Sequence, residues 1–485
     1  MDNDKPFETL DPEDWDKMRG LAHQMIDDAI DYLKTVGERP VWQQVPETVK
    51  DTFKSGVPID SQDPAAVYQD FVTNILPYPM GNIHPRFWSW YMGSGTIMGA
   101  LADFMAATMN PNMGGGNHAA MLVEDQVLNW MKQVVGMPAN ASGLLVSGGS
   151  MANLVGLTIA RNTLVDFNIR KDGIQSIDKK LTVYASTEVH SSNQKAVELL
   201  GLGSDCLRKI PVNDDYTINL DELIETVERD IESGFKPICI IATSGTVNTG
   251  AIDDLPGIAD LCEKHGIWFH VDGAIGAIAM ISDLVRPLLS GIERADSISM
   301  DLHKWMHVPF EASCVLVRDK KAHHDSFALT PEYLAKATGG LASGPEWYSE
   351  YGVQLSRSFR ALKIWMTMKQ HGTKKLGRMI TRNVDQARYL GGLIEKTGNL
   401  ELIAPIGLDI VCFRYNPGKT SLERLNELNR EILIQLQEQG IAAPSFTTLN
   451  GQYCIRVAIA NHRSRCQDFD VLIAETMRLG KSLSS

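Results

Sequence analysis

The most informative stretch of this sequence is Ser297-Ile-Ser-Met-Asp-Leu-His-Lys-Trp-Met-His-Val-Pro-Phe310. It lies between two apolar runs, residues 266–272 and residues 312–318, that have the composition of buried strands. Lys304 therefore follows one expected strand, and Asp272 ends the strand before it. An amine and a carboxylate held at the ends of neighbouring strands can perform chemistry on a carbonyl group.

Lys304 and Asp272 each have an ordinary interpretation and a chemical one. A lysine amine becomes a nucleophile only when it is neutral, and partial burial beside Trp305 and Phe310 lowers a lysine pKa, so that a Schiff base can form. Taken alone, Lys304 would be interpreted as a solvated surface lysine. Asp272 favours the chemical interpretation, because a carboxylate in an apolar run needs a cation or a hydrogen-bond donor as its partner.

Together these two residues meet the requirements of pyridoxal phosphate, whose aldehyde is held by a lysine and whose pyridine nitrogen faces an aspartate. Three motifs are more specific: Ser-x-x-x-Asp-x-His-Lys-Trp at 297–305, His-Val-Asp-x-Ala at 270–274 and Ser-Gly-Gly-Ser-x-Ala-Asn at 147–153. They resemble the group II pyridoxal-phosphate-dependent decarboxylases, the family of the aromatic-amino-acid, tyrosine, histidine and glutamate decarboxylases. The resemblance extends over nearly the whole chain, residues 10–480.

The phosphate group of such a cofactor needs a cradle of backbone amides. Residues 143–154 read as a strand, a tight turn and a helix, and the free N–H groups and dipole of a helix start bind phosphate. A Ser-Gly-Gly-Ser turn is common in proteins, but here it matches the phosphate loop of the resembling family. Gly149 and Ser150 are therefore the expected phosphate ligands.

Further contacts are implied by the resemblance alone. It implies that His190 lies flat against the cofactor ring, although a lone histidine is more often a hydrogen-bonded structural residue. It also implies cofactor contacts from Thr246, Ala274 and His303, of which Thr246 is equally consistent with an ordinary exit from a strand. The family carries a mobile catalytic loop, and Tyr333 matches its tyrosine; without the resemblance, Tyr333 would be a surface residue of a long loop.

An aromatic stretch at residues 77–96 is interrupted by glycine and proline, so no long regular element is expected there. Its aromatic residues are consistent with a core. The matching stretch of the family, however, lines the substrate pocket, which makes Trp90, Tyr91 and Met92 candidates for substrate binding.

Three polar residues are further pocket candidates. Asn110 and Asn112 stand in a loop where aromatic-specific relatives usually carry apolar side chains, and Ser356 matches a position that touches the substrate side chain. Trp90 and Tyr91 suit an aromatic ring, whereas the polar residues favour a side chain such as imidazole or phenol. We therefore expect an amino acid substrate with an aromatic or imidazole side chain.

Beyond residue 180, strand-like segments alternate with helical ones. Strands are expected at 181–185, 206–212, 237–242, 268–271 and 297–300, and helices at 191–200, 219–232, 255–265, 361–370 and 374–396. This alternation predicts an α/β fold with a mostly parallel central sheet flanked by helices, and with ligands at the carboxyl ends of its strands. The resemblance implies a fold-type-I pyridoxal enzyme.

Three parts of the chain are expected. Residues 1–86 would form an N-terminal helical dimerisation segment, residues 87–362 a large cofactor-binding domain, and residues 363–485 a small C-terminal α/β domain. Residues 11–35 have helical periodicity, with Asp11 as N-cap. The family packs this segment across a dimer partner, so we expect a homodimer; the alternative is that the segment covers its own domain.

The composition excludes several other classes of protein. The 485 residues carry a formal net charge of −13, which argues against nucleic-acid binding and against anionic membranes. The seven cysteines contain no Cys-x-x-Cys pair, and no signal-peptide or membrane-spanning pattern is found, which predicts a cytoplasmic protein with reduced thiols. No metal site is expected.

The resemblance implies decarboxylation of an L-amino acid to its amine and carbon dioxide. Lys304 would hold the cofactor, Asp272 would keep the ring nitrogen protonated, and Tyr333 would protonate Cα. An aldehyde synthase is the nearest alternative, although such members typically alter the stacking histidine or the lid tyrosine, and both are retained here. An aminotransferase would usually show a dedicated arginine for the α-carboxylate, and a desulfurase a loop cysteine; neither can be assigned in this sequence. A non-catalytic protein would not need lysine, aspartate and histidine together.

Overall fold

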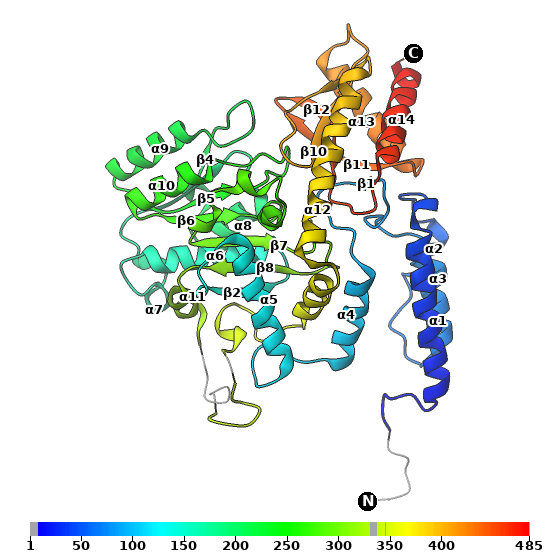
Figure 1. The fold of residues 1–485 in the computed structure, drawn as a ribbon, viewed down its shortest axis with the longest axis horizontal. Helices are drawn as coiled ribbons and strands as arrows, with labels where there is room; N and C mark the ends of the chain where they lie inside the picture. The colour runs from blue at the N-terminus through cyan, green and yellow to red at the C-terminus, as the bar shows by residue number, and fades with distance from the viewer. Residues whose placement is uncertain (1–7, 330–336, 345, 485) are drawn as a thin grey trace, which may run out of the picture.

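Seven strands form the central sheet of the larger part of the chain in a computed structural model, which describes residues 8–329, 337–344 and 346–484 (Figure 1). Their order across the sheet is β2-β8-β7-β6-β5-β3-β4. The strands are β2 (Ser142–Val146), β3 (Leu181–Ser186), β4 (Leu207–Ile210), β5 (Lys236–Thr243), β6 (Trp268–Asp272), β7 (Ser297–Asp301) and β8 (Ser313–Val317). All five strands expected between residues 181 and 300 are therefore confirmed.

The sheet is mostly parallel, as predicted. Strands β4, β3, β5, β6 and β7 pair in parallel, and only β8 runs antiparallel to both of its neighbours, β7 and β2. A parallel neighbour requires a crossover of a dozen or more residues. The link from β7 to β8, residues 302–312, is too short for one, so β8 returns antiparallel to β7, and Lys304 lies in this link.

Helices cover both faces of this sheet. As a result, every residue of β2, β3, β6, β7 and β8 is buried. The predicted helices 191–200, 219–232 and 255–265 are confirmed as α8, α9 and α10. The helices of this part are α5 (Ala119–Val135), α6 (Gly149–Leu164), α7 (Ile169–Asp172), α8 (Ser191–Leu199), α9 (Leu220–Glu232), α10 (Leu255–His265) and α11 (Lys320–Phe327).

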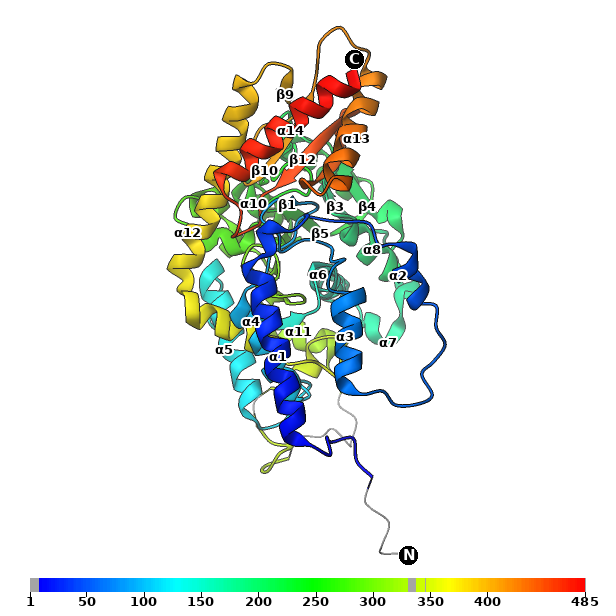
Figure 2. The same cartoon turned by 90° about the vertical axis from the view of Figure 1, so that its right-hand side faces the viewer.

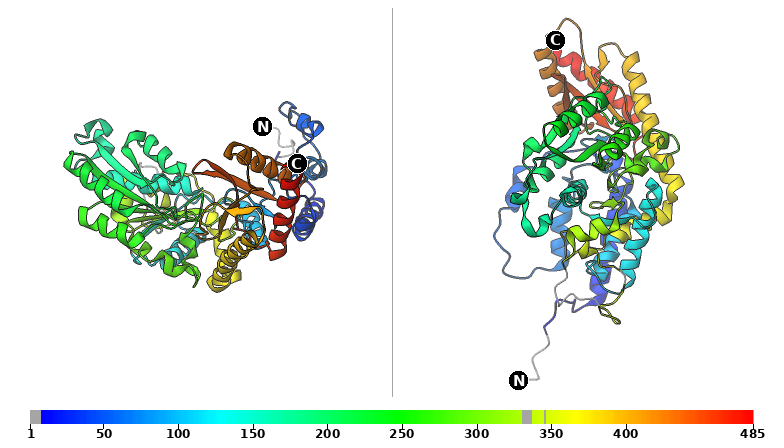
Figure 3. Two further views of the ribbon diagram at one scale, coloured as in Figure 1. Left: turned by 90° about the horizontal axis from the view of Figure 1, so that it is seen from above. Right: turned by 90° about the vertical axis from the view of Figure 1, so that its left-hand side faces the viewer.

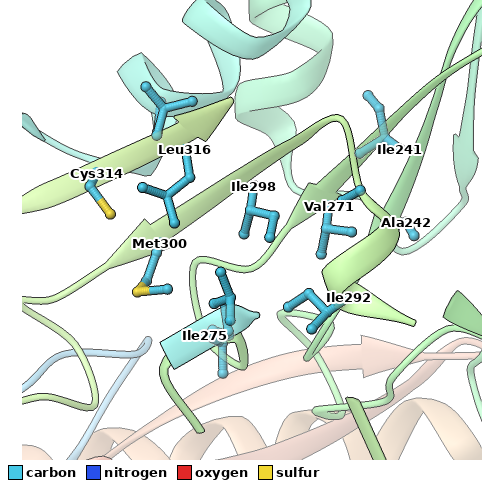
Figure 4. Packing of buried hydrophobic residues seen from close by; sticks show 14 of the residues in the cluster. Ile241, Ala242, Val271, Ile275, Ile292, Ile298, Met300, Cys314 and Leu316 are labelled. Carbon is cyan, nitrogen blue, oxygen red and sulfur yellow. The ribbon is translucent and has the colours of Figure 1, made fainter. Parts of the chain in front are cut away.

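Apolar side chains from neighbouring strands fix the relative positions of β5 to β8 (Figure 4). Ile241 comes from β5, Val271 from β6, Ile298 from β7 and Leu316 from β8, and all four are completely buried. Burial of such a side chain contributes about 1.5–3 kcal/mol. This core places the carboxyl ends of β6 and β7, and therefore Asp272 and Lys304, in one rigid frame.

A second sheet organises the C-terminal part, with strand order β1-β11-β12-β10-β9. Phe87 and Trp88 form β1, which pairs in parallel with β11, so this short piece of the aromatic stretch joins the C-terminal sheet. The remaining elements are β9 (Leu400–Leu402), β10 (Ile410–Tyr415), β11 (Ala443–Leu449), β12 (Gln452–Ala458), α13 (Leu422–Glu438) and α14 (Cys466–Ser484). Seen from above, the second sheet lies between the central sheet and the N-terminal segment, which is drawn in blue (Figure 3).

One long helix, α12 (Arg360–Lys396), connects the two parts: it contacts α4 (Ile97–Met109) and α5 as well as β9, β10 and α14. Gly372 interrupts it with a φ of 67°, in the left-handed region that favours glycine. The prediction of two helices, 361–370 and 374–396, is confirmed by this break.

The N-terminal helices α1 (Trp15–Lys34), α2 (Glu47–Thr52) and α3 (Pro64–Asn74) stand along one side of the molecule (Figure 2). The predicted start of the first helix was wrong. Asp14, not Asp11, is the N-cap, because its carboxylate accepts hydrogen bonds from the backbone N–H groups of Asp16 and Lys17. No residue of α1 is buried. Among the described residues, no helix is long and apolar enough to cross a membrane.

Candidate active site

Several of the predicted functional residues gather at the carboxyl ends of the strands. Asp272 is the last residue of β6, Lys304 follows β7, and His190 and Gly149 begin the helices that follow β3 and β2. They surround a cavity of about 350 Å³. Its lining residues are Ser147, Gly148, Gly149, Ser150, Asn153, His190, Ser192, Thr243, Gly245, Val247, Asp272, Ala274, Ile275, Asp301, His303, Lys304, Phe310 and Glu311.

Lys304 reaches into this cavity with its amine held by a carboxylate. Its Nζ lies 2.9 Å from Oδ2 of Asp301, and the Asp301 side chain is only 4% exposed. Asp301 also accepts a hydrogen bond from the hydroxyl of Ser313. Burial raises the pKa of Asp301, but Lys304, His303 and Ser313 outweigh burial and hold this pKa below its ordinary value.

Asp272 is buried and is satisfied by neutral donors. Its Oδ2 accepts from the side-chain amides of Asn153 at 2.9 Å and Asn193 at 2.8 Å. Its Oδ1 accepts from the hydroxyl of Ser299 and from the backbone N–H of Ala274, both at 3.3 Å. The expectation that this carboxylate must have hydrogen-bonding partners is therefore confirmed, and four donors fix its orientation.

His190 lines the same cavity as Asp272 and caps helix α8. Its Nδ1 accepts from the backbone N–H of Ser192 at 3.2 Å and lies 2.7 Å from the Ser192 hydroxyl oxygen. Burial lowers the pKa of His190 and outweighs the nearby carboxylate of Asp272, which raises it, so that the neutral imidazole is favoured.

The start of helix α6 can receive an anion. Gly148 is its N-cap and supplies no side-chain hydrogen bond, which leaves first-turn amides directed at the cavity. A Cβ added at Gly149 would lie 3.0 Å from Asp301 Oδ2, so glycine is needed for this close approach. The hydroxyl of Thr243, which also lines the cavity, is buried and has no hydrogen-bond partner among the described residues.

Two of the three remaining cofactor candidates line the cavity, and the third does not. Ala274 and His303 belong to the lining, and the ring of His303 lies against that of Phe310, with 4.4 Å between centroids. Thr246 is turned away: its hydroxyl lies 2.9 Å from that of Thr249 and accepts from a backbone N–H at 3.0 Å. These bonds close the turn after β5, and the neighbouring Gly245 and Val247 line the cavity instead.

The aromatic substrate candidates do not line the cavity of this single chain. Trp90 is 57% exposed. Tyr91 is buried, and its hydroxyl donates to Oδ2 of Asp409 at 2.7 Å. Met92 packs against the small cluster that includes Phe87.

The polar substrate candidates also lie outside the cavity lining. Asn110 ends α4 with a φ of 46°, and Ser356 is exposed. Asn112 supports the loop, because its Oδ1 accepts from the backbone N–H groups of Gly114 and Arg357. Tyr333 lies outside the described residues.

Several site residues were not singled out from the sequence. Asn153 and Asp301 stood inside the quoted motifs, the first at the end of Ser-Gly-Gly-Ser-x-Ala-Asn and the second three residues before Lys304. Asn193 and Thr243 had no comparable signal. Only strand register brings Thr243 beside Asp272, since these residues pair across β5 and β6.

Comparison with known proteins gives a consistent result over the whole chain. Residues 46–416 match the family model described as the pyridoxal-dependent decarboxylase conserved domain. An aromatic-L-amino-acid decarboxylase of Bacillus atrophaeus is 31% identical over 473 residues, which cover 97% of this chain and 96% of that protein. Tyrosine decarboxylase 4 of Petroselinum crispum is 32% identical, with coverage of 94% and 91%. A phenylacetaldehyde synthase of Arabidopsis thaliana is 30% identical, with coverage of 93% of both chains.

Among solved structures, the Oryza sativa protein described as TDC with PLP and tryptamine superimposes with a TM-score of 0.90 at 27% identity. The match covers 98% of this chain and 100% of that one.

The fold and the site together define a fold-type-I pyridoxal-phosphate enzyme. An amine, a buried carboxylate, an uncapped helix start and an unpartnered hydroxyl surround one cavity, and this donor set fits the aldehyde, ring nitrogen and phosphate of that cofactor. The chain belongs to the pyridoxal-dependent decarboxylase family, within the group II enzymes. It is a pyridoxal-phosphate-dependent amino acid decarboxylase.

Proposed function

We propose that this enzyme converts an L-amino acid with an aromatic or imidazole side chain into the corresponding amine and carbon dioxide, and that it works as a homodimer. The observation that carries the proposal is the placement of Lys304 and Asp272 on one cavity of about 350 Å³, together with the uncapped start of helix α6. The most similar proteins reported above act on aromatic amino acids, by their names, which supports the side-chain class.

Several of the cavity residues have a role in this proposal. When bound, pyridoxal phosphate supplies an aldehyde that captures an amino group and a ring that accepts the electrons released from a bond to Cα. Lys304 would hold the aldehyde carbon, and the carboxylate of Asp272 would keep the ring nitrogen protonated. The backbone of Gly149 and Ser150 and the hydroxyl of Thr243 hold the phosphate group.

The choice of bond depends on how the residues orient the substrate. Only the Cα bond perpendicular to the ring plane can release its electrons into the ring. His190 would cover one face of the ring, and a closed, water-poor site would favour loss of the carboxylate as carbon dioxide. Tyr333 then delivers a proton to Cα.

The proposal of a homodimer is supported by apolar side chains that the single chain leaves exposed. Trp15 and Met25 on α1 are 61% and 45% exposed, and Phe104 and Met109 on α4 are 55% and 57% exposed. These exposed side chains on α1 and α4 are the apolar region that a second copy would cover. A second copy that covers this region could also bring Trp90, Asn110 and Ser356 close to the cavity. A monomer at every concentration in sedimentation would contradict the proposal.

The substrate class is tested by measuring carbon dioxide release from each of the twenty standard amino acids and from dihydroxyphenylalanine. We expect release from one or more of tyrosine, dihydroxyphenylalanine, tryptophan, phenylalanine and histidine. Release from glutamate alone would contradict the proposed pocket.

An aldehyde synthase is the second candidate, because a phenylacetaldehyde synthase is among the relatives that match nearly the whole chain. His190 and Tyr333 favour simple decarboxylation, since synthases typically alter one of the two. Parallel assays for hydrogen peroxide and ammonia distinguish the candidates: both products accompany carbon dioxide only if an aldehyde is formed.

A cytoplasmic location is also proposed. All seven cysteines have free thiols, and six of them are buried, which suits a reducing compartment.

A further inference from the structure

A continuous chain of side-chain hydrogen bonds runs beside the cavity, from Trp268 on β6 to His190 at the start of α8. The Trp268 indole N–H donates to Ser297 Oγ at 2.8 Å, and this oxygen lies 2.7 Å from His270 Nδ1. His270 Nε2 lies 3.0 Å from Asn153 Oδ1. Asn153 Nδ2 lies 2.9 Å from Asp272 Oδ2 and 3.2 Å from the hydroxyl of Ser192, which contacts His190.

The direction of the buried half of this chain follows from Asp272. A carboxylate accepts hydrogen bonds, so the Asn153 group that faces it must be the NH2 group; the reverse orientation would place two acceptors 2.9 Å apart. The Asn153 oxygen therefore faces His270 Nε2, which must carry the hydrogen. Ser297 accepts from the donor-only indole of Trp268 and gives its own hydrogen to His270 Nδ1. Burial lowers the pKa of His270 to about 4, consistent with this neutral ring.

The direction of the other half follows from the second hydrogen of the Asn153 NH2 group. This hydrogen points to the Ser192 hydroxyl oxygen, so Ser192 is left to donate its own hydrogen to His190 Nδ1. The backbone N–H of Ser192 is directed at the same nitrogen. His190 Nδ1 is therefore an acceptor of two hydrogen bonds, and the single proton of the neutral imidazole is on Nε2.

We propose that Asn153 and Ser192 are positioning residues that couple Asp272 to His190 and hold His190 as its Nε2–H tautomer. This inference rests on the proposed function only in placing His190 beside the cofactor. The ring then offers a hydrogen-bond donor on the edge away from Ser192, and it cannot take up a proton at Nδ1 without breaking both bonds from Ser192. The side-chain amide of Asn153 thus orients both Asp272 and, through Ser192, the imidazole of His190.

The test is the protonation state of His190, read by ¹⁵N NMR of the full-length protein labelled at histidine, both without cofactor and after addition of pyridoxal phosphate. The His190 signals are assigned by their loss in a His190→Gln variant. In the wild-type protein, we expect a hydrogen-bearing Nε2 and an unprotonated Nδ1 near neutral pH.

Two variants break the link at different points. Ser192→Ala removes the hydroxyl donor, and the population ratio of the Nε2–H to the Nδ1–H tautomer is expected to fall by about fivefold to tenfold, the change that one hydrogen bond supplies. Asn153→Asp replaces the NH2 donor by an acceptor, so that Ser192 turns its hydrogen toward residue 153 and accepts from His190 Nδ1 instead. The tautomer ratio is expected to shift in the same direction.

Asn193→Ala is the matched control. Asn193 donates to the same oxygen of Asp272 as Asn153 does, and at a similar distance, but no hydrogen bond joins its side chain to Ser192 or His190 in the described residues. We expect the His190 tautomer to be unchanged in this variant.

An Nδ1–H tautomer in the wild-type protein would overturn the inference, and so would a tautomer ratio that neither Ser192→Ala nor Asn153→Asp changes in folded protein. The tautomer is measured without turnover, so the proposed coupling and the proposed function can be contradicted independently of each other. Absence of decarboxylation with an Nε2–H tautomer would contradict the proposed function and leave the coupling intact.

Discussion

The ammonium group of Lys304 and the carboxylate of Asp301 form a salt bridge of 2.9 Å on the wall of the active-site cavity. The two residues are three positions apart, on either side of the end of β7, so the strand and the turn that follows it are enough to bring them together. The salt bridge directs the lysine side chain into the cavity, and it gives the free ammonium a partner close to the start of helix α6.

Replacing this carboxylate should have a pH-dependent effect on stability. The pKa of Asp301 in the folded state is lower than its ordinary value of 3.8, so its stabilisation is fully present above that value and is lost as the pH falls through the lower, folded-state pKa. Near neutral pH, Asp301→Asn should lower the free energy of unfolding of the protein without cofactor by about 1–3 kcal/mol. Urea unfolding should show that this difference shrinks on acidification. A difference that grows toward low pH would contradict the assignment.

Removing the charge of Asp272 should affect catalysis more than folding. Asp272→Asn keeps the shape of the side chain but removes the negative charge opposite the ring nitrogen, and kcat should fall by about a hundredfold to a thousandfold. Asp230→Asn is the control, because Asp230 is also buried but accepts hydrogen bonds from Tyr184 and Arg208, away from the cavity. That variant should keep its kcat even if its thermal stability falls. Equal kcat losses in both variants would indicate a structural role for Asp272.

His323 should make the protein sensitive to acid. Burial lowers the pKa of this ring to about 4, where it lies 2.8 Å from both the Ser142 hydroxyl oxygen and the carbonyl oxygen of Tyr351. Between the ordinary histidine pKa of 6.5 and this value, the unfolded chain binds more protons than the folded one. The free energy of unfolding therefore decreases as the pH is lowered over this range, by up to about 3 kcal/mol. Urea unfolding from pH 6.5 to 4 should show a smaller loss for His323→Gln. Identical slopes would exclude this histidine as a cause.

A charge within the exposed apolar region should dissociate the proposed dimer. Phe104→Asp places a carboxylate among the exposed apolar residues of α1 and α4, and sedimentation should show a shift toward monomer together with loss of activity. Leu199→Asp changes an even more exposed apolar residue, on α8, and serves as the control. It should leave the sedimentation coefficient unchanged.

The fold was largely predictable, because alternating strand and helix patterns report on the periodicity of the backbone. The expected strands at 237–242, 268–271 and 297–300 became β5, β6 and β7, and the expected phosphate loop became the start of α6. Features that depend on contacts between distant residues were not predictable. Nothing in the local sequence indicates that Asn193 meets Asp272, or that the Thr246 hydroxyl would be used to close its own turn.

The missed helix cap has a local reason. Asp11 and Asp14 both precede the apolar stripe of α1, and the sequence does not distinguish two acidic residues one turn apart. The substrate residues illustrate a different limit: Trp90, Asn110 and Ser356 do not line the cavity of a single chain, so their proposed roles depend on a second chain that the sequence cannot place.

The most direct test of the account is the site of covalent attachment. The protein is incubated with pyridoxal phosphate, reduced with borohydride, digested, and examined by mass spectrometry. We expect the reduced cofactor to be attached to Lys304, and Lys304→Arg to carry no label while remaining folded. Attachment at another lysine, or a Lys304→Arg variant that still decarboxylates amino acids at the normal rate, would contradict it.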